Sequence, residues 1–272
     1  MRKILFCLPI VFIFVSAVFA EQVVVEGEVR SLRPPTEQAV KKLRLDTYYE
    51  YSWIKQGGRH ILWKTGFANV SFNAGKGVTP YVSLTSYNRN HVADETVELG
   101  TYAGWAGGVA HAALGYGTAD PDFVYKFQAQ IGYEHRLVKN LSWKFDYRFL
   151  DYRTNDVNIL IPGLIYYFGN SYWIFEYGLS ETENRGLAQW GTLKANLYIN
   201  EFLDFSIGSA AGERLFDIFD TLKAGQQYGY LFFAGPRFKI GPDASLRIGY
   251  SYAVEKPSFF KRGVDLTFSV KF

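Results

Sequence analysis

The most constraining feature of this chain is an alternation of apolar and polar residues that begins at Leu43 and recurs up to the last residue. In residues 43–53, leucine, tyrosine and tryptophan alternate with arginine, aspartate and glutamate, and residues 123–134, 141–149 and 264–272 repeat the pattern. A helix would place its apolar residues three or four positions apart, whereas a period of two places them on one face of a strand. The pattern therefore predicts a chain built from β-strands.

The residue types on the two faces favour a membrane barrel over a soluble β-sandwich, whose strands also alternate. The apolar face is rich in tyrosine, phenylalanine and tryptophan near the strand ends, as aromatic girdles at two membrane interfaces require. The other face carries charged residues in strand centres, where a soluble core could not bury them without partners. Aromatic residues reach 18%, yet the mean hydropathy is only −0.07. Strands with one lipid-facing side and one wet side account for both values.

The alternation predicts fourteen strands, and an even number returns both termini of a bacterial single-chain barrel to the periplasm. The second and fifth strands are the least regular, so a barrel of twelve strands is the alternative. The predicted fold is an all-β, transmembrane antiparallel β-barrel. Its strands are expected near residues 43–55, 60–70, 78–88, 96–104, 108–117, 123–136, 140–152, 156–168, 171–180, 189–199, 201–210, 227–238, 244–253 and 262–272.

The predicted connections alternate in length. Several are brief, at residues 137–139, 169–170 and 200, while those at 88–95, 181–189, 211–226 and 254–261 are longer. Short periplasmic turns and longer outer loops are the usual asymmetry of such barrels. We therefore expect the outer membrane of a Gram-negative bacterium, with both termini in the periplasm.

The first residues have the order of an export signal. Arg2 and Lys3 precede an apolar run over residues 4–15, and small residues then lead to Ala20. A run of about twelve apolar residues is too short to span a bilayer. Residues 1–20 are therefore predicted to be a signal peptide cleaved before Glu21. Residues 21–42 would form a short periplasmic segment, and residues 43–272 the barrel.

Cleavage would remove the only cysteine, Cys7, which excludes a disulfide scaffold, a cysteine nucleophile and a thiolate metal site. It would also lower the count of basic residues from 29 to 27 against 26 acidic ones, so the net charge falls from +3 to +1. A nucleic-acid partner would require a basic excess. We expect no nucleic-acid partner and no cofactor.

Histidines are the remaining candidates for catalysis. His91 stands beside Asp94 in a predicted outer loop, and His60 opens the second strand at the same rim. A His–Asp pair could serve as the general base of a lipid hydrolase, but no serine lies in a nucleophile motif, and no two histidines stand at metal-ligand spacing. We expect no catalytic or metal-binding residues and no enzymatic activity; a rim lipid hydrolase is the remote alternative.

The polar face of the strands defines the expected lumen. Both signs of charge are mixed there, whereas a selective ion pore would concentrate one sign in a ring. Mixed charge indicates either a salt-bridged, mostly closed interior or a weakly selective channel. Tyrosines on the same face could stack on sugars or simply fill a narrow barrel. The lumen-facing candidates are Lys126, Glu134, Lys144, Asp146, Arg148, Glu176 and Arg247, together with Arg44, Asp46, Glu50, Lys64, Glu98, Lys194 and Asp265 and the tyrosines Tyr48, Tyr81, Tyr87, Tyr166 and Tyr198.

Residues 114–178 resemble the YaiO family of outer-membrane β-barrel proteins. The resemblance is carried by the motif LGYG at residues 114–117 and by RFLDYRTNDVNILIPGLIYYFGNSYW at residues 148–173. It implies an outer-membrane barrel, in some members linked to surface polysaccharide, and no catalytic residues to transfer. We expect a porin-like, non-enzymatic barrel that transports or supports export of a surface polysaccharide or another polar solute. The alternative is a structural or surface-binding barrel with a plugged lumen.

The expected partners follow from this location. They are outer-membrane lipids with lipopolysaccharide, a surface glycan, and the barrel-assembly machinery during biogenesis. Alternating apolar residues ending in an aromatic, as in residues 264–272, resemble the signal that this machinery reads. Phe268, Val270 and Phe272 would form that signal.

Deletion of Phe272, or its replacement by lysine, is predicted to impair insertion while leaving the alternating strands intact. Immunoblots of cell fractions should show less protein in the outer membrane, with periplasmic accumulation and degradation. Wild-type levels in the outer membrane after the deletion would mean that Phe272 is only the end of a strand.

Overall fold

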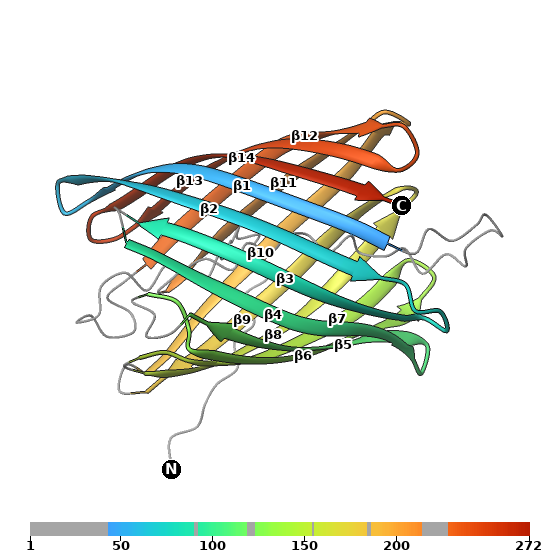
Figure 1. Cartoon of the computed structure of the whole chain (residues 1–272), viewed down its shortest axis with the longest axis horizontal. Coiled ribbons are helices and arrows are strands. Elements are labelled where there is room, and N and C mark those ends of the chain that lie inside the picture. The colour runs from blue at the N-terminus through green and yellow to red at the C-terminus, as the bar shows by residue number, and fades with distance from the viewer. Residues whose placement is uncertain (1–42, 90–91, 119–122, 154, 184–185, 214–227) are drawn as a thin grey trace, which may run out of the picture.

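The structure, a computed structural model, describes residues 43–89, 92–118, 123–153, 155–183, 186–213 and 228–272. In these residues the chain forms a closed barrel of fourteen antiparallel strands, in which each strand pairs with its neighbours in sequence and β1 closes on β14 (Figure 1). The predicted all-β barrel is confirmed, and the alternative of twelve strands is wrong. The predicted signal peptide (1–20) and periplasmic segment (21–42) lie outside the described residues. Among the residues described, no helix is long and apolar enough to cross a membrane.

The strands follow one another around the barrel with no crossover. In order they are β1 (Leu43–Gln56), β2 (Arg59–Phe72), β3 (Val78–Arg89), β4 (Val92–Trp105), β5 (Gly108–Gly117), β6 (Phe127–Val138), β7 (Leu141–Asp151), β8 (Asp156–Phe168), β9 (Ser171–Thr182), β10 (Gly186–Asn200), β11 (Leu203–Glu213), β12 (Tyr228–Ile240), β13 (Ala244–Glu255) and β14 (Phe259–Lys271).

Several strands are longer than their apolar pattern predicted. Strand β4 begins at Val92 rather than at residue 96, and β14 begins at Phe259 rather than at residue 262. The predicted long connections at 88–95, 181–189 and 254–261 are therefore wrong. Polar side chains marked these segments as loops, but strand pairing continues through them, as the pairs Arg89–Val92, Thr182–Gly186 and Glu255–Phe259 show. Strand β6 is shorter than predicted, beginning at Phe127 instead of residue 123.

The two ends of the barrel differ. The end at which β1 begins and β14 ends, called here the terminal end, has the short connections 106–107, 139–140, 169–170, 201–202 and 241–243, and the slightly longer 73–77. The other end, called here the distal end, has connections of unequal length, including 118–126 and 214–227. A solute would therefore meet different surfaces at the two mouths.

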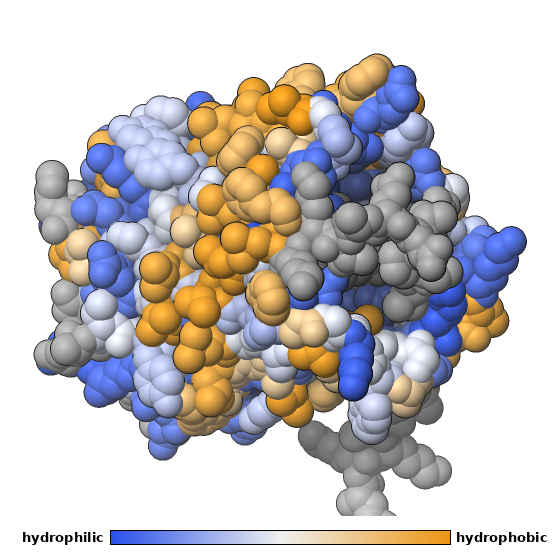
Figure 2. All heavy atoms as spheres, turned by 45° about the vertical axis from the view of Figure 1, so that its right-hand side comes forward, coloured by the Kyte–Doolittle hydropathy of each residue, from blue (hydrophilic) through white to orange (hydrophobic). Residues whose placement is uncertain are grey.

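The outward face of the strands is apolar. Leu84, Leu99 and Ile131 point outward near the middle of their strands with exposed fractions of 58%, 57% and 55%. Figure 2 shows such side chains as a band across one side of the barrel, with hydrophilic side chains toward both ends. A belt this large would be unstable in water. It matches the hydrocarbon core of a bilayer, where closure of the barrel also leaves no unpaired strand edge.

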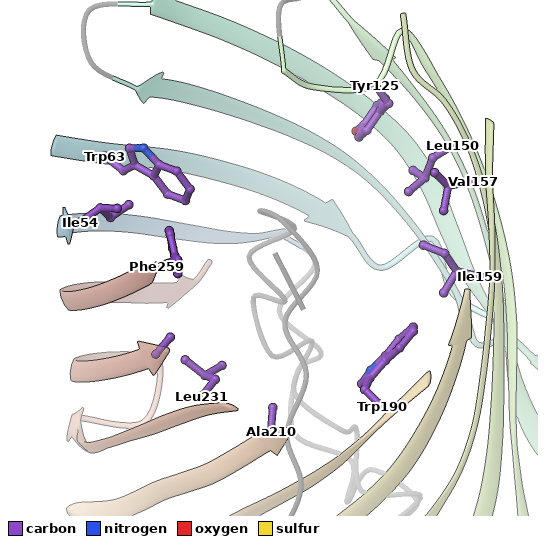
Figure 3. Packing of buried hydrophobic residues seen from close by; sticks show 11 residues of the cluster. Ile54, Trp63, Tyr125, Leu150, Val157, Ile159, Trp190, Ala210, Leu231 and Phe259 are labelled. Carbon is purple, nitrogen blue, oxygen red and sulfur yellow. The ribbon is translucent and has the colours of Figure 1, made fainter. Parts of the chain in front are cut away.

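The inward face carries a group of buried apolar side chains toward the distal end. They project into the barrel from strands around much of the wall and, for Tyr125, from the 118–126 connection, as Figure 3 shows. This group, named the apolar collar, comprises Ile54, Trp63, Tyr125, Leu150, Val157, Ile159, Trp190, Ala210, Leu231, Ala253 and Phe259. The rest of the inward face is largely polar, so the lumen is chemically divided along its length.

A closed barrel of this kind is predicted to resist unfolding by detergent at room temperature, because every strand is paired on both sides. Unheated protein should migrate differently from boiled protein on an SDS gel, and its circular dichroism spectrum should be dominated by strand. Equal migration together with a helical spectrum would contradict the closed barrel.

Candidate functional site

The strand pairing determines which side chains face the lumen. Glu134 pairs with Lys144, and Gln130 pairs with Arg148, across β6 and β7. All of these lie on the inward face, as do Asp146 and the predicted residues Glu176 and Arg247. Lys126 differs, because it is exposed and lies ahead of the first residue of β6. The prediction that a strand carries Lys126 is therefore wrong, while its position in the lumen stays a prediction.

Four predicted lumen residues form one continuous chain of ion pairs. Nζ of Lys144 lies 3.0 Å from Oδ2 of Asp146 and 2.6 Å from Oε1 of Glu176. The other oxygen of Glu176, Oε2, lies 3.0 Å from Nζ of Lys194. The exposed fractions of these side chains range from 9% to 22%. This ion-pair chain alternates in sign across β7, β9 and β10, so each inner member balances two opposite charges.

Glycine allows the chain to cross the strand between its members. Strand β8 lies between β7 and β9, and its Gly163 pairs with Lys144 on one side and Glu176 on the other. A Cβ at Gly163 would lie 3.1 Å from Cγ of Lys144, 3.2 Å from Cγ of Glu176 and 2.7 Å from the carbonyl oxygen of Phe175. The two charged side chains can therefore meet over β8 only because no side chain stands there.

A second polar group continues the network toward β3. The hydroxyl of Tyr81 donates to Oε1 of Glu98 at 2.7 Å and lies 2.8 Å from Nε2 of His111. The amide of Gln128 donates to Oε2 of Glu98 at 2.8 Å. The ring of His111 stacks on Tyr102 with 4.5 Å between centroids. One side of the wall is therefore lined by fixed polar groups from β3 to β10.

The other side of the barrel carries separate ion pairs. Lys261 lies 2.8 Å from Glu50, and Arg247 lies 3.3 Å from Asp265. Glu50 also accepts hydrogen bonds from Ser52 at 2.6 Å and from Tyr48 at 3.2 Å. Nearer the termini, Arg44 pairs with Asp46 and Lys239 pairs with Asp204, each at 2.8 Å. Both signs are again mixed.

Four of these charged residues, Arg44, Asp204, Lys239 and Arg247, border a pocket at the terminal end. Its volume is about 290 Å³, and it lies on strands β1 and β11 to β14. We call it the terminal-mouth pocket. Its charged lining residues are Arg44, Glu201, Asp204, Arg237, Lys239, Asp243, Arg247 and Lys271, with Tyr48 and Thr267 among the neutral ones.

Two further predicted lumen residues point the wrong way. Lys64 pairs with Tyr51 on the outward face, and its Nζ lies 5.9 Å from the centre of the Tyr51 ring. Tyr166 also faces outward, with an exposed fraction of 46%. In β2 the inward positions include Trp63, so the apolar residues there do not mark the lipid-facing side. The remaining predicted lumen tyrosines, Tyr48, Tyr81, Tyr87 and Tyr198, are at inward register positions.

Sequence reasoning missed Lys261, Lys239 and Asp204 as lumen residues. Lys261 precedes the predicted start of the last strand, although it stands four positions before the inward Asp265 and so shares its face. Extending the period of two backward from Asp265 would have identified it. Asp204 of β11 stands opposite Arg237 of β12, and Lys239, two positions further along β12, reaches it diagonally, which only the cross-strand register determines.

Of the candidate catalytic residues, the structure describes Asp94 and His60, and these two lie on opposite faces of the wall. Asp94 points inward and is 4% exposed, and its Oδ2 accepts hydrogen bonds from the N–H groups of Phe123 at 2.8 Å and Val124 at 3.2 Å. His60 pairs with Lys55 on the opposite, outward face. His91 lies outside the described residues. The visible role of Asp94 is to hold the end of the 118–126 connection against the wall.

The predicted assembly residues lie at the closure of the barrel. Phe268 and Val270 are outward positions of β14, and Phe272 directly follows this strand with an exposed fraction of 60%. The N–H of Phe272 donates to the carbonyl oxygen of Leu43 at 2.8 Å. Recognition of these residues by assembly machinery stays a prediction.

Substitution of Gly163 by alanine is predicted to destabilise the barrel, because the new methyl group displaces Lys144 and Glu176 and meets the Phe175 carbonyl. Overpacking of this kind costs about 1–3 kcal/mol. Urea titration in detergent, followed by tryptophan fluorescence, measures the effect. Gly66→Ala is the matched control, because a Cβ at this strand glycine meets nothing within 4 Å. Equal midpoints for the two variants would contradict the proposed role of Gly163.

Comparison with solved structures shows what the chain is similar to. The CymD monoaromatic hydrocarbon channel shares 8% identity at a TM-score of 0.59, over 85% of this chain and 89% of that one. A bacterial polysaccharide outer membrane secretin shares 9% at 0.58, over 86% and 100%. The Acinetobacter baumannii outer membrane protein Omp33 shares 13% at 0.52, over 85% and 99%. At these identities the similarity shows the fold alone.

Sequence comparisons give the family. Comparison with curated proteins found no match. The profile of the YaiO membrane beta barrel domain matches residues 42–211, which include the segment that carried the resemblance. This family and the solved structures above indicate an outer-membrane barrel. Because the match covers more than half of the 272 residues, the chain belongs to the YaiO family of membrane β-barrels.

Proposed function

We propose that this barrel is a non-enzymatic channel that passes a polar, hydroxylated solute, with a surface polysaccharide as the candidate. The observation that carries the proposal is the terminal-mouth pocket, whose volume is about 290 Å³ and whose lining is charged in both signs. A pocket for an apolar solute would be lined mainly by aliphatic and aromatic side chains. The polysaccharide secretin with the same fold supports a glycan but does not identify it.

The chemistry of the pocket suits a sugar. Arg44 and Lys239 are donors, Asp204 is an acceptor, and Tyr48 offers a ring and a hydroxyl. The pairs Arg44–Asp46 and Lys239–Asp204 hold these groups in place before any solute arrives. Sugar hydroxyls can replace water on such preset groups without disrupting the ion pairs.

We further propose that the pocket opens to the periplasm. The connections at the terminal end are short, while 118–126 and 214–227 lie at the distal end. This is the usual asymmetry between periplasmic turns and outer loops. A polysaccharide on its way out would then meet the terminal-mouth pocket first and the apolar collar last.

The apolar collar supports a low conductance at rest. Hydrophobic constrictions oppose water and ions by dewetting. Trp63, Trp190 and Phe259 supply large side chains to this level of the lumen. The same observation favours the second candidate function, a structural or surface-binding barrel with a closed lumen, and bilayer recordings distinguish the two.

In a planar bilayer, the wild type is predicted to conduct little and to change its current when oligosaccharides are added on the pocket side. Lys239→Gln should weaken this response by about tenfold, because the variant loses a charged donor and removes the Lys239 ammonium from Asp204. The control Lys76→Gln removes an equal charge from the 73–77 turn at the same end.

A large, steady conductance that does not change when oligosaccharides are added would contradict a glycan-responsive lumen and indicate a simple water-filled pore. The absence of both a current and any response to oligosaccharides would favour the closed structural barrel. Asp146→Ala provides a further comparison. We expect this variant to raise ion leakage, because Lys144 loses one of its two carboxylates.

A further inference from the structure

The outward face of the distal rim carries a concentration of cations on three adjacent strands. All of them are exposed, and they lie on β14, β1 and β2 or on the turns that join these strands to their neighbours. This group, named the basic patch, comprises the cations Lys55, Lys64, Lys256 and Arg262, together with His60, which pairs with Lys55. Arg59 of the same turn pairs with Gln56 at an inward register position and is not part of the patch.

Strand register places these cations side by side. On the central strand β1, Lys55 pairs with His60 of β2, and Trp53 pairs with Arg262 of β14. One outward position further from the rim, Tyr51 pairs with Lys64. The two distal turns also touch, since the N–H of Gly57 donates to the carbonyl oxygen of Ser258 at 3.3 Å. The patch is therefore one continuous surface.

The cations of the patch have no carboxylate partner within the part of the chain that the structure describes. Lys64 and Arg262 instead lie over aromatic rings, each 5.9 Å from the centre of Tyr51 and Tyr252 respectively. The lysines of the lumen, in contrast, are paired with carboxylates. Unneutralised positive charge held on aromatic rings is suited to an external anion.

The acidic residues of the same rim are placed elsewhere. Among the outward strand positions described at the distal end, carboxylates occur on β4, β7, β8, β9 and β11, and none occurs on β14, β1 or β2. They are Glu95, Asp151, Asp156, Glu181 and Glu213. Among the described outward strand positions, the basic residues and the carboxylates thus lie on different strands, and an anionic partner would approach from the side of β1.

The depth of the patch corresponds to lipid headgroups. Trp53, exposed by 51%, lies between the cations, and the positions farther from the rim are apolar, including Val264 and Leu266 with 41% and 47% exposed. Aromatic belts lie at the membrane–water interface, and long basic side chains extend from there toward the headgroups. The cations are therefore placed to meet phosphate groups at this interface.

We propose that the basic patch binds the phosphate groups of lipopolysaccharide in the outer leaflet. This rests on the orientation proposed above, in which the distal end faces outward. The two phosphorylated sugars of lipid A would present their charges to Lys64 and Arg262 on either side of β1. Arg262 can bind a phosphate with two parallel hydrogen bonds, and the acyl chains would lie against the apolar belt.

The test uses the full barrel in detergent and measures retained lipid by native mass spectrometry. The double variant Lys64→Gln/Arg262→Gln should retain bis-phosphorylated lipid A about tenfold less well than wild type. Monophosphoryl lipid A should bind wild type more weakly than the bis-phosphorylated form. The control Lys76→Gln/Lys139→Gln removes the same charge from turns at the other end and should retain lipid A as wild type does.

Equal retention by the two double variants would overturn the proposal, as would equal binding of lipid A and phosphatidylglycerol. Competition by inorganic phosphate at low concentration would indicate a site for free phosphate instead. Both variants should keep the heat-dependent gel shift, which shows that they fold. They should also keep the response of the current to oligosaccharides, so this test and that of the lumen can fail separately.

Orientation is tested with Lys55→Cys, because the only natural cysteine, Cys7, lies in the predicted signal peptide. A membrane-impermeant maleimide should label this variant on intact cells. Labelling only after the outer membrane is opened would place the patch on the periplasmic side and overturn the assignment to lipopolysaccharide.

Discussion

The structure depends on one constraint, which is that a backbone crossing lipid must satisfy its own hydrogen bonds. A row of strands achieves this only when the last strand pairs with the first. Here β14 pairs with β1 along nearly its whole length, and Phe272 and Leu43 exchange hydrogen bonds at the end of the seam. The period of two follows from that closure, because every strand then has one face toward lipid and one toward the lumen.

Closure of the barrel also determines how the charged side chains of the lumen are paired. A lumen wall built from alternate residues brings charged side chains close together across strands, and desolvation makes any unpaired one costly. Lys144 and Glu176 meet this demand by pairing over an intervening strand, with Gly163 leaving the space. Gly132 serves Asp146 similarly, since a Cβ there would lie 2.3 Å from Oδ1 of Asp146. In both places, the glycine leaves the space that the neighbouring charged side chains occupy.

Prediction from the sequence was most successful where the two-residue period of side-chain direction in a strand determines which residues are apolar. The alternation predicted the fold and the strand count because the lipid-facing residues must be apolar. It failed at β2, where Trp63 faces inward and Lys64 outward, since the interior toward the distal end is itself apolar. There the contrast between the two faces disappears and hydrophobicity alone cannot assign them.

Other features depend on register rather than on pattern. The predicted residues Glu134, Lys144, Asp146 and Glu176 do face inward, yet nothing in the sequence says that Lys144 joins two carboxylates or that Glu176 reaches Lys194. Those pairs depend on how each strand is aligned with the next. Lys126 was wrongly assigned to a strand because the strand pattern was extended into the 118–126 connection, where buried Val124 and Tyr125 break the alternation.

The ion-pair chain of the lumen has a consequence for how solutes of different charge would partition. Its members alternate in sign, from Asp146 through Lys144 and Glu176 to Lys194, so positive and negative charges along it are equal in number. Seen from a few ångströms away, their fields largely cancel. Dissolved salt therefore has little long-range field to screen, and solute entry past this wall should be almost insensitive to ionic strength. Discrimination there would depend on shape and hydrogen bonding, as it does between neutral sugars.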